Sequence, residues 1–223
     1  MILLLISCPG ADALSPADSA EVPRWESFDT LDPGRWLTAD WTLGKSQLVA
    51  DNVTIQDGHL VLDHAGAGDT WSGAEVYTAD TFTGGQFTAR VQPPASPGTV
   101  CAFFFYGTDP EGLVHEIDVE LLDGRLVVGT FAAWHPSHGY ENGPTREYAW
   151  IDVATGGVLD YTIDWQPGAV SFAVDGTAVA TFTTAVPTLS LPIHLNHWTS
   201  DTWPEVGYPP RSPLQCRFDF VDR

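Results

Sequence analysis

Short runs of alternating apolar and polar residues recur along the chain. Clear examples lie at residues 59–63, 85–91, 126–128 and 160–165. Because successive side chains of a β-strand point to opposite faces of a sheet, each run predicts a strand with one buried face. Asp-Gly turns such as Asp57-Gly58 and Asp175-Gly176 separate the runs. No helical pattern exceeds a turn or two, so the sequence predicts an all-β protein, a β-sandwich.

One predicted strand differs from the others in its chemistry. Residues 115–121 read His-Glu-Ile-Asp-Val-Glu-Leu, so that Glu116, Asp118 and Glu120 share one face. Three like charges on one face repel each other, so the arrangement is energetically unfavourable for a strand with only a structural role. Paired carboxyl groups are what cleavage of a glycosidic bond needs. The alternative is an acidic strand that faces solvent, as is common in a chain this negative.

The spacing of these acids is compatible with catalysis. Cα atoms four residues apart on a strand are separated by roughly 13 Å, and the side chains of Glu116 and Glu120 can lean together across Asp118. Carboxyl groups about 5–5.5 Å apart are typical of retaining glycosidases. Asp118 can hydrogen-bond Glu116. We also expect the negative charge of Asp118 to raise the pKa of its neighbours and keep one glutamate protonated as an acid.

Composition excludes several kinds of partner. The chain has 223 residues, enough for one domain with a substantial core, and a formal charge of −20 with Lys45 as its single lysine. Nucleic acids and anionic membranes need a basic patch that this chain lacks. A neutral polymer is compatible with such a surface.

The N-terminus resembles an export signal. Residues 1–6 are apolar, and Leu5-Ile6-Ser7-Cys8 looks like the cleavage box of a bacterial lipoprotein, with a lipid anchor at Cys8. A basic n-region is missing, which favours a truncated signal; a chance apolar tail is the alternative. We therefore expect a signal remnant and flexible spacer at 1–22, one domain at 23–223, and a secreted or surface-anchored protein. No later segment has the ~20 apolar residues of a transmembrane span.

Two further cysteines, Cys101 and Cys216, lie in apolar strand patterns. Their spacing resembles neither a zinc motif nor a redox motif. The sequence leaves open a disulfide and two buried thiols.

From Trp25 to the C-terminus the chain resembles glycoside hydrolase family 16, especially its bacterial lichenases (β-1,3-1,4-glucanases). The motifs that carry this resemblance, in order, are the opening segment 25–36, Ser-Gly-Ala-Glu-Val-Tyr at 72–77, residues 84–91, the E-I-D-x-E strand, Asp-Trp-Gln-Pro-Gly at 164–168 and Asn-His-Trp at 196–198. The resemblance implies a jelly roll of two curved antiparallel sheets with a concave substrate cleft. It implies an endo-acting retaining glycoside hydrolase that cleaves a β-linked polysaccharide, most readily a β-glucan.

The resemblance also assigns roles to residues. Glu116 would be the nucleophile, Asp118 its helper and Glu120 the acid/base. Aromatic side chains that alternate onto the cleft face could stack on sugar rings, although packing in the core is the alternative for each. The expected substrate-binding residues are Glu75, Phe104, Tyr106, Trp134, His135, His194, Asn196 and Trp198.

Three departures from the lichenase pattern weaken any inference about specificity. Val114 and Tyr77 replace a cleft tryptophan and a cleft arginine, and residues 127–132 are largely apolar. Preference for lichenan therefore does not follow. A transglycosylase that uses the same acids is the nearest alternative, and a non-catalytic glycan-binding module is an alternative of another class.

The family often carries a structural calcium on its convex side. Ser27, Gly58 and Asp219 fall at the matching positions, and oxygen ligands suit Ca²⁺. Catalysis should need no cofactor. The two His-x-x-His spacings, at 135–138 and 194–197, are a weak indication of a metal site on strands or loops. A monomer is expected.

Overall fold

The computed structural model describes residues 25–134, 146–211 and 213–223. The expected signal segment with Cys8, and the predicted cleft residue His135, lie outside the described residues. The strands are β1 Trp36–Thr38, β2 Thr42–Leu43, β3 Ser46–Leu48, β4 Val53–Gln56, β5 His59–Ala67, β6 Thr70–Thr78, β7 Gly85–Gln92, β8 Val100–Thr108, β9 Val114–Leu122, β10 Arg125–Trp134, β11 Arg146–Asp152, β12 Leu159–Gln166, β13 Ala169–Val174, β14 Thr177–Phe182, β15 Ile193–Trp198 and β16 Leu214–Asp222. Two single-turn 3₁₀ helices, η1 (Ala50–Asn52) and η3 (Pro204–Val206), join them.

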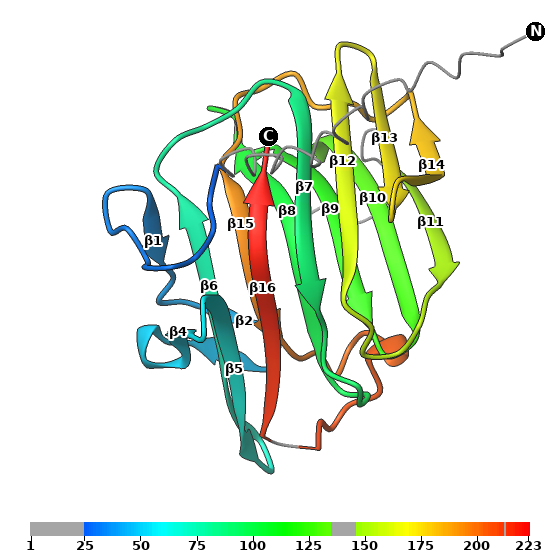
Figure 1. The fold of residues 1–223 in the computed structure, drawn as a ribbon. Coiled ribbons are helices and arrows are strands. Elements are labelled where there is room, and N and C mark those ends of the chain that lie inside the picture. Colours follow the sequence, from blue (N-terminus) through cyan, green and yellow to red (C-terminus); the bar gives the residue numbers. More distant parts are fainter. Residues whose placement is uncertain (1–24, 135–145, 212) are drawn as a thin grey trace, which may run out of the picture.

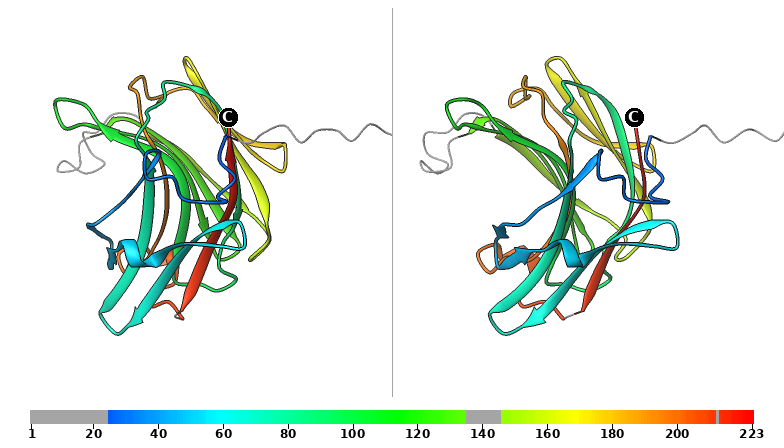
Figure 2. Two further views of the ribbon diagram at one scale, coloured as in Figure 1. Left: turned by 60° about the vertical axis from the view of Figure 1, so that its left-hand side comes forward. Right: turned by 90° about the vertical axis from the view of Figure 1, so that its left-hand side faces the viewer.

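The strands form two facing layers. One layer has the order β11-β10-β9-β8-β15-β6 and the other β5-β16-β7-β12-β13-β14, and the β5–β6 pairing links the two (Figure 1). The pairs along this path are antiparallel, and both layers curve (Figure 2). The predicted all-β jelly-roll sandwich is thus confirmed. Among the described residues, no helix is long and apolar enough to cross a membrane.

The core lies between the layers and follows the predicted alternation. Ile117, Val119 and Leu121 on β9 are at most 1 % exposed and pack against aromatic side chains from both layers. Phe103 and Phe105 on β8 are in the same core, as is Trp165 on β12. Side chains alternate between the two faces of a strand, and the odd-numbered residues of β8 and β9 point into the core. Their even-numbered residues therefore point to the opposite face of the layer. That face carries the acids.

A disulfide joins the two layers. Cys101 on β8 and Cys216 on β16 are bonded, with their Cα atoms 6.0 Å apart and a sequence separation of 115. The sequence had left a disulfide and two buried thiols open, since the register that brings β8 over β16 cannot be read from local patterns.

Replacing both cysteines by alanine should lower the free energy of unfolding by roughly 2–5 kcal/mol, because the cross-link restricts a long loop in the unfolded chain. Urea unfolding of the oxidised protein and of the Cys101→Ala/Cys216→Ala variant measures this. Reductant should destabilise the wild type and leave the variant unaffected. An equal urea midpoint for the oxidised wild type and the variant would contradict the prediction that the disulfide stabilises the fold.

Candidate active site

Strand β9 places its three acids in the middle of the six-stranded layer. Their neighbours in register are Tyr106, Phe104 and Ala102 on β8, and Phe131, Gly129 and Val127 on β10. Each acid therefore belongs to a row of three cross-strand neighbours, one each from β8, β9 and β10, and the three rows lie side by side on the same face. Glu116 and Glu120 are partly exposed, whereas Asp118 between them is 5 % exposed.

Two adjoining cavities open over this face, with volumes of about 440 and 500 Å³. Both are lined by Asp118, Glu120 and Trp198, so together they form one groove that passes over β9. The 440 Å³ cavity is also lined by Trp41, Leu43, Glu75, Ala102, Phe104, Tyr106, Glu116, His194 and Asn196. The 500 Å³ cavity is also lined by Val127, Gly129, Phe131, Arg146, Tyr148, Trp150, Ser200, Thr202, Trp203 and Glu205.

The electrostatics of the groove favour protonated carboxyl groups. Burial raises the pKa of Glu116 and Glu120 above the ordinary glutamate value of 4.5. Burial also raises the pKa of Asp118 well above 3.8, and the charges of Glu116 and Glu120 raise it further. Asp118 shares a hydrogen bond with Glu116 that lowers the pKa of Glu116. Asp118 is thus best placed to hold the proton and donate it to a charged Glu116.

This arrangement corrects one expectation from the sequence. The sequence predicts that a negative charge on Asp118 raises the pKa of the acid. In the structure the pKa of Glu120 is raised first by burial and then by the charge of Glu116. Burial of a carboxyl group disfavours its charged form, and the depth of the groove could not be judged from the sequence.

A second polar cluster lies at one end of the groove. The Glu75 side chain is 3 % exposed; its Oε1 lies 2.8 Å from His194 Nδ1, and its Oε2 accepts a 3.2 Å hydrogen bond from Asn196 Nδ2. Within the described residues, His194 Nε2 and Asn196 Oδ1 have no hydrogen-bond partner. Buried polar atoms normally have partners, so these two atoms are suited to hold hydroxyl groups of a ligand.

Aromatic side chains form the rest of this end. Tyr106 is 37 % exposed and can stack on a ligand, whereas Phe104 is 8 % exposed and its ring lies 4.9 Å from the ring of His194. Trp41 is 42 % exposed and its ring lies 5.8 Å from that of Tyr77. Sequence reasoning missed Trp41, although an isolated tryptophan among polar turn residues was a usable signal.

The other predicted site residues have mixed outcomes. Trp198 lines both cavities. Trp134, at the end of β10, lines neither of them; its ring lies 6.1 Å from that of Phe131. His194 and His197 point to opposite faces of β15, and His197 is buried against Leu62 and Thr99. This pair therefore cannot share a metal ion.

The residues expected to bind calcium include one carboxylate, which has basic side chains near it. Asp219 is the only carboxylate of the set, and its oxygens lie 3.7 Å from His59 Nε2 and 3.8 Å from Arg90 Nη1. Arg90 makes its closer ion pair with Asp160, 2.7 Å from Nε to Oδ1. The described residues contain no cluster of three or more His, Cys, Asp or Glu side chains that could hold a metal. The calcium site at Ser27, Gly58 and Asp219 stays a prediction.

Comparisons with known proteins relate the chain to one family. The model of a family described as "Glycosyl hydrolases family 16" matches residues 38–208. A beta-glucanase of Acetivibrio thermocellus is 26% identical over 235 residues, covering 99% of this chain and 68% of the relative. A beta-glucanase of Paenibacillus polymyxa is 27% identical over 207 residues, covering 88% and 81%.

Solved structures show the same fold. The Bacillus licheniformis beta-glucanase superposes with a TM-score of 0.75 at 23% identity, covering 88% of this chain and 94% of that one. A prokaryotic beta-1,3-1,4-glucanase (lichenase) from a mouse hindgut metagenome superposes with a TM-score of 0.74 at 25% identity, covering 88% and 95%.

Proposed function

Because this chain belongs to glycosyl hydrolase family 16 and is a glycoside hydrolase, we propose that it is an endo-acting, retaining enzyme that cleaves β-glucan. The observation that carries the proposal is the position of Glu116, Asp118 and Glu120 midway along a groove that continues on both sides of β9. A polymer can cross such a groove, which favours cleavage within the chain. The substrate class is suggested by relatives that are named beta-glucanases.

In the first step of the proposed mechanism, the Glu116 carboxylate attacks the anomeric carbon of the sugar in the 440 Å³ cavity. Protonated Glu120 gives its proton to the departing glycosidic oxygen, and the C–O bond to the leaving sugar breaks. Asp118 donates a hydrogen bond to Glu116. This bond restrains the nucleophile and favours its charged form.

In the second step, the Glu120 carboxylate takes a proton from water, and the water oxygen bonds to the anomeric carbon. The bond between that carbon and Glu116 breaks, which restores both carboxyl groups. Two displacements at one carbon return the original anomeric configuration. We assign hydroxyl recognition next to this carbon to Glu75, His194 and Asn196, and ring stacking to Tyr106 and Trp198.

A panel of soluble polysaccharides tests the proposal, with new reducing ends measured and the first-formed anomer followed by NMR. We expect cleavage of a β-glucan, a rapid fall in polymer size, and an initial product of retained configuration. Initial product of inverted configuration would refute the retaining mechanism. Binding without any turnover would support the non-catalytic module instead.

The pH dependence of kcat/KM should be bell-shaped, with both limbs above the range of ordinary carboxyl groups. Activity requires a charged Glu116, so it is lost as pH falls through the raised pKa of that residue. It also requires a protonated Glu120, so it is lost as pH rises through the raised pKa of the acid. Because the two carboxyl groups interact, the apparent pKa values read from the two limbs belong to the pair and not to either residue alone. A pH optimum near 4.5 or below would contradict the prediction that burial raises the pKa of both glutamates.

A transglycosylase is the second candidate. It would use the same acids, with a sugar hydroxyl in place of water. The observation in its favour is the number of aromatic side chains in the 500 Å³ cavity, which could retain an acceptor sugar. Products longer than the donor would identify it.

We also propose that the protein is exported. The disulfide favours an oxidising compartment, and the apolar N-terminal segment is consistent with a signal. Separation of culture supernatant from membranes, with mass spectrometry of Cys8, distinguishes a secreted protein from a lipid-anchored one.

A further inference from the structure

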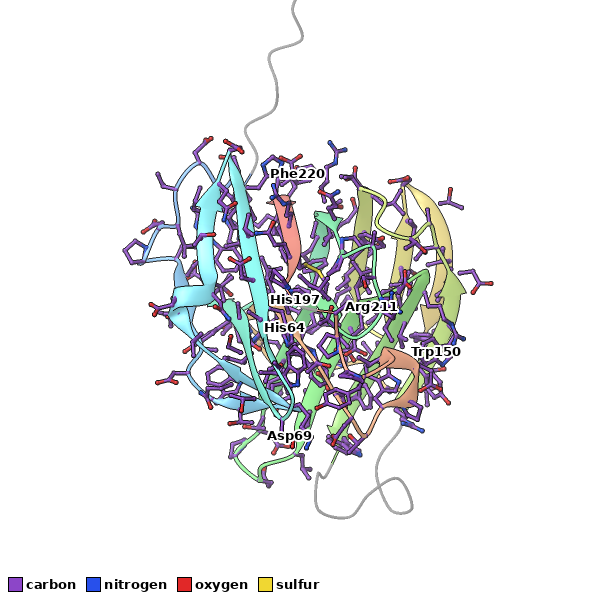
Figure 3. The ribbon with its side chains drawn as sticks, turned by 90° about the horizontal axis from the view of Figure 1, so that it is seen from below. His64, Asp69, Trp150, His197, Arg211 and Phe220 are labelled. Atoms are coloured by element: carbon purple, nitrogen blue, oxygen red, sulfur yellow. A yellow bond between two sulfur atoms is a disulfide. The ribbon has the colours of Figure 1, made fainter. Side chains whose placement is uncertain are left out.

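Two buried histidines lie at one end of the core, and the proposed mechanism uses neither of them. His64 on β5 and His197 on β15 each come two residues after a leucine of the main core, and both side chains are fully buried. Their ring centroids are 5.4 Å apart, and Figure 3 shows the two side chains next to each other between the layers (Figure 3). Buried polar groups are stable where hydrogen bonds satisfy them, so the partners of these rings indicate what the rings do.

Hydrogen bonds connect His64 to the groove. His64 Nε2 lies 3.0 Å from Ser46 Oγ on β3, and Ser46 Oγ accepts a 3.0 Å hydrogen bond from the backbone N–H of Thr199. Thr199 is buried and directly follows Trp198, which lines both cavities of the groove. The next residue, Ser200, lines the 500 Å³ cavity. One hydroxyl group therefore links the histidine to the backbone between two groove residues.

Thr199 is held at its other polar atoms as well. Its carbonyl oxygen accepts a 2.9 Å hydrogen bond from the backbone N–H of Lys45, and its hydroxyl donates to the carbonyl oxygen of Gly98. The N–H of Gly98 in turn donates a 2.7 Å hydrogen bond to the carbonyl oxygen of Val206 in η3. A buried backbone N–H without a partner is unfavourable, so loss of the Ser46 acceptor should displace this segment.

The bond to Ser46 fits an uncharged His64. Ser46 Oγ already accepts the Thr199 N–H, and its own proton is then available to a neutral Nε2. The ring proton is in that case on Nδ1, which has no hydrogen-bond partner within the described residues. A second proton, on Nε2, would turn the Ser46 hydroxyl away and place a charge in the core. We therefore assign the neutral ring to the folded state.

The rings around His64 do not reverse this preference. Stacking on Trp71, at 5.5 Å between ring centroids, favours a charged ring modestly. His197 is neutral as well, because its Nδ1 donates to the carbonyl oxygen of Leu62 and its Nε2 accepts from the hydroxyl of Thr99. Burial outweighs the stacking: it lowers the pKa of His64 from 6.5 to about 4 and that of His197 to about 3.

Charged side chains on the surrounding elements have other partners. Asp63 on β5 accepts a hydrogen bond from Gln215, which also accepts one from Arg217 on β16. Lys45 pairs with Asp201 at 2.9 Å. The remaining groups near the pair are the exposed Asp69 in the turn between β5 and β6, Tyr208 packed on the edge of Trp71, and Cys101 of the disulfide, the partner of His197 in register.

We propose that Ser46 and His64 are positioning residues for segment 198–200 of the groove, and that they hold this segment only while His64 is uncharged. Acid then loosens one wall of the groove by a route separate from the titration of the catalytic carboxyl groups. The role in glycan binding rests on the proposed function. The link between His64, Ser46 and the segment does not.

Hydrogen exchange and steady-state kinetics at neutral pH test the positioning role. In Ser46→Ala, residues 198–203 should lose protection against exchange. The KM for β-glucan should rise about three- to tenfold, with a smaller change in kcat, because the displaced segment binds substrate and does not touch the reacting bond. Unchanged exchange in these residues would overturn the inference.

Thr78→Val is the matched control for Ser46→Ala. The Thr78 hydroxyl accepts a buried 3.0 Å hydrogen bond from the N–H of Ile193, at the opposite end of β15. This variant should lose a similar amount of thermal stability and leave the exchange of residues 198–203 unchanged. Equal loss of protection there in both variants would reduce the role of Ser46 to general stability and overturn the inference.

Urea unfolding tests the role of the charge, since turnover in acid is already lost through Glu116. The unfolded chain binds a proton that folded His64 excludes, so stability falls as pH falls from about 6.5 to about 4. Between pH 7 and pH 4, the folding equilibrium constant of wild type should therefore fall about 100-fold more than that of His64→Gln. Glutamine can still bond Ser46 but does not titrate.

His59→Gln is the control for the loss of a histidine, because His59 lies on the same strand with its side chain 38% exposed. Its stability should follow the pH dependence of the wild type. The same pH dependence in wild type and His64→Gln would overturn the role of the charge. If wild type cleaves no β-glucan, the proposed function fails, while hydrogen exchange and urea unfolding still decide whether His64 and Ser46 hold the segment.

Discussion

Replacing Glu116 by alanine should lower kcat on β-glucan by about 10⁴-fold or more, because removing a nucleophile removes the covalent step that it makes possible. Reducing ends released per unit time measure the effect. Glu111→Ala is a matched control, since Glu111 is an exposed glutamate in the turn before β9. Its activity should equal that of the wild type.

The same variant also tests the direction of attack. Truncation of Glu116 leaves space on the face of the sugar from which the carboxylate would approach. A small anion such as azide, added with a substrate that has an activated leaving group, should enter this space and form a glycosyl azide. A single displacement from that face inverts the anomeric configuration. A product of retained configuration would show that Glu116 is not the nucleophile.

Replacing Glu120 by glutamine should produce a loss that depends on the leaving group. For polysaccharide, whose leaving oxygen needs a proton, we expect kcat/KM to fall by about 10²–10⁴-fold. For a dinitrophenyl glycoside the leaving group departs without protonation, so its release should change far less. The alkaline limb of the pH profile should also disappear, since the group that titrates there is gone.

Single-turnover measurements with both substrates separate these steps. With the activated substrate, Glu120→Gln should release a burst of dinitrophenol and then turn over slowly, because water lacks its general base. Equal losses on the two substrates would instead assign Glu120 a structural role in the groove.

Much of this site was predictable because it depends on local alternation. The period of two in residues 115–121 indicates at once that the three acids share a face and that Ile117 packs inside. The motifs of the family predicted the jelly roll, which is confirmed, and pointed to Glu75 and Asn196. The structure brings both residues into the groove.

Features that depend on register or on loops were not predictable. Trp150 and Trp203 meet at 6.1 Å although 52 residues separate them in the sequence. No local pattern reports which strands become neighbours. His64 is a clearer case: it is fully buried, 3.0 Å from Ser46 and stacked on Trp71, with His197 nearby (Figure 3). A histidine among the alternating residues of β5 gives no sign of such surroundings.

The register of the six-stranded layer has a consequence for how this enzyme could change. Trp41 stands beside β6 and Trp150 on β11, at opposite margins of the layer, and five strand spacings amount to roughly 24 Å. The free-energy changes caused by two substitutions that far apart, with no shared partner, usually add. Preference on the two sides of the scissile bond could therefore be redesigned separately, by evolution or in the laboratory, while the strand between them keeps its chemistry. Free-energy changes of kcat/KM that fail to sum in a Trp41→Ala/Trp150→Ala double variant would show that the two margins are energetically coupled.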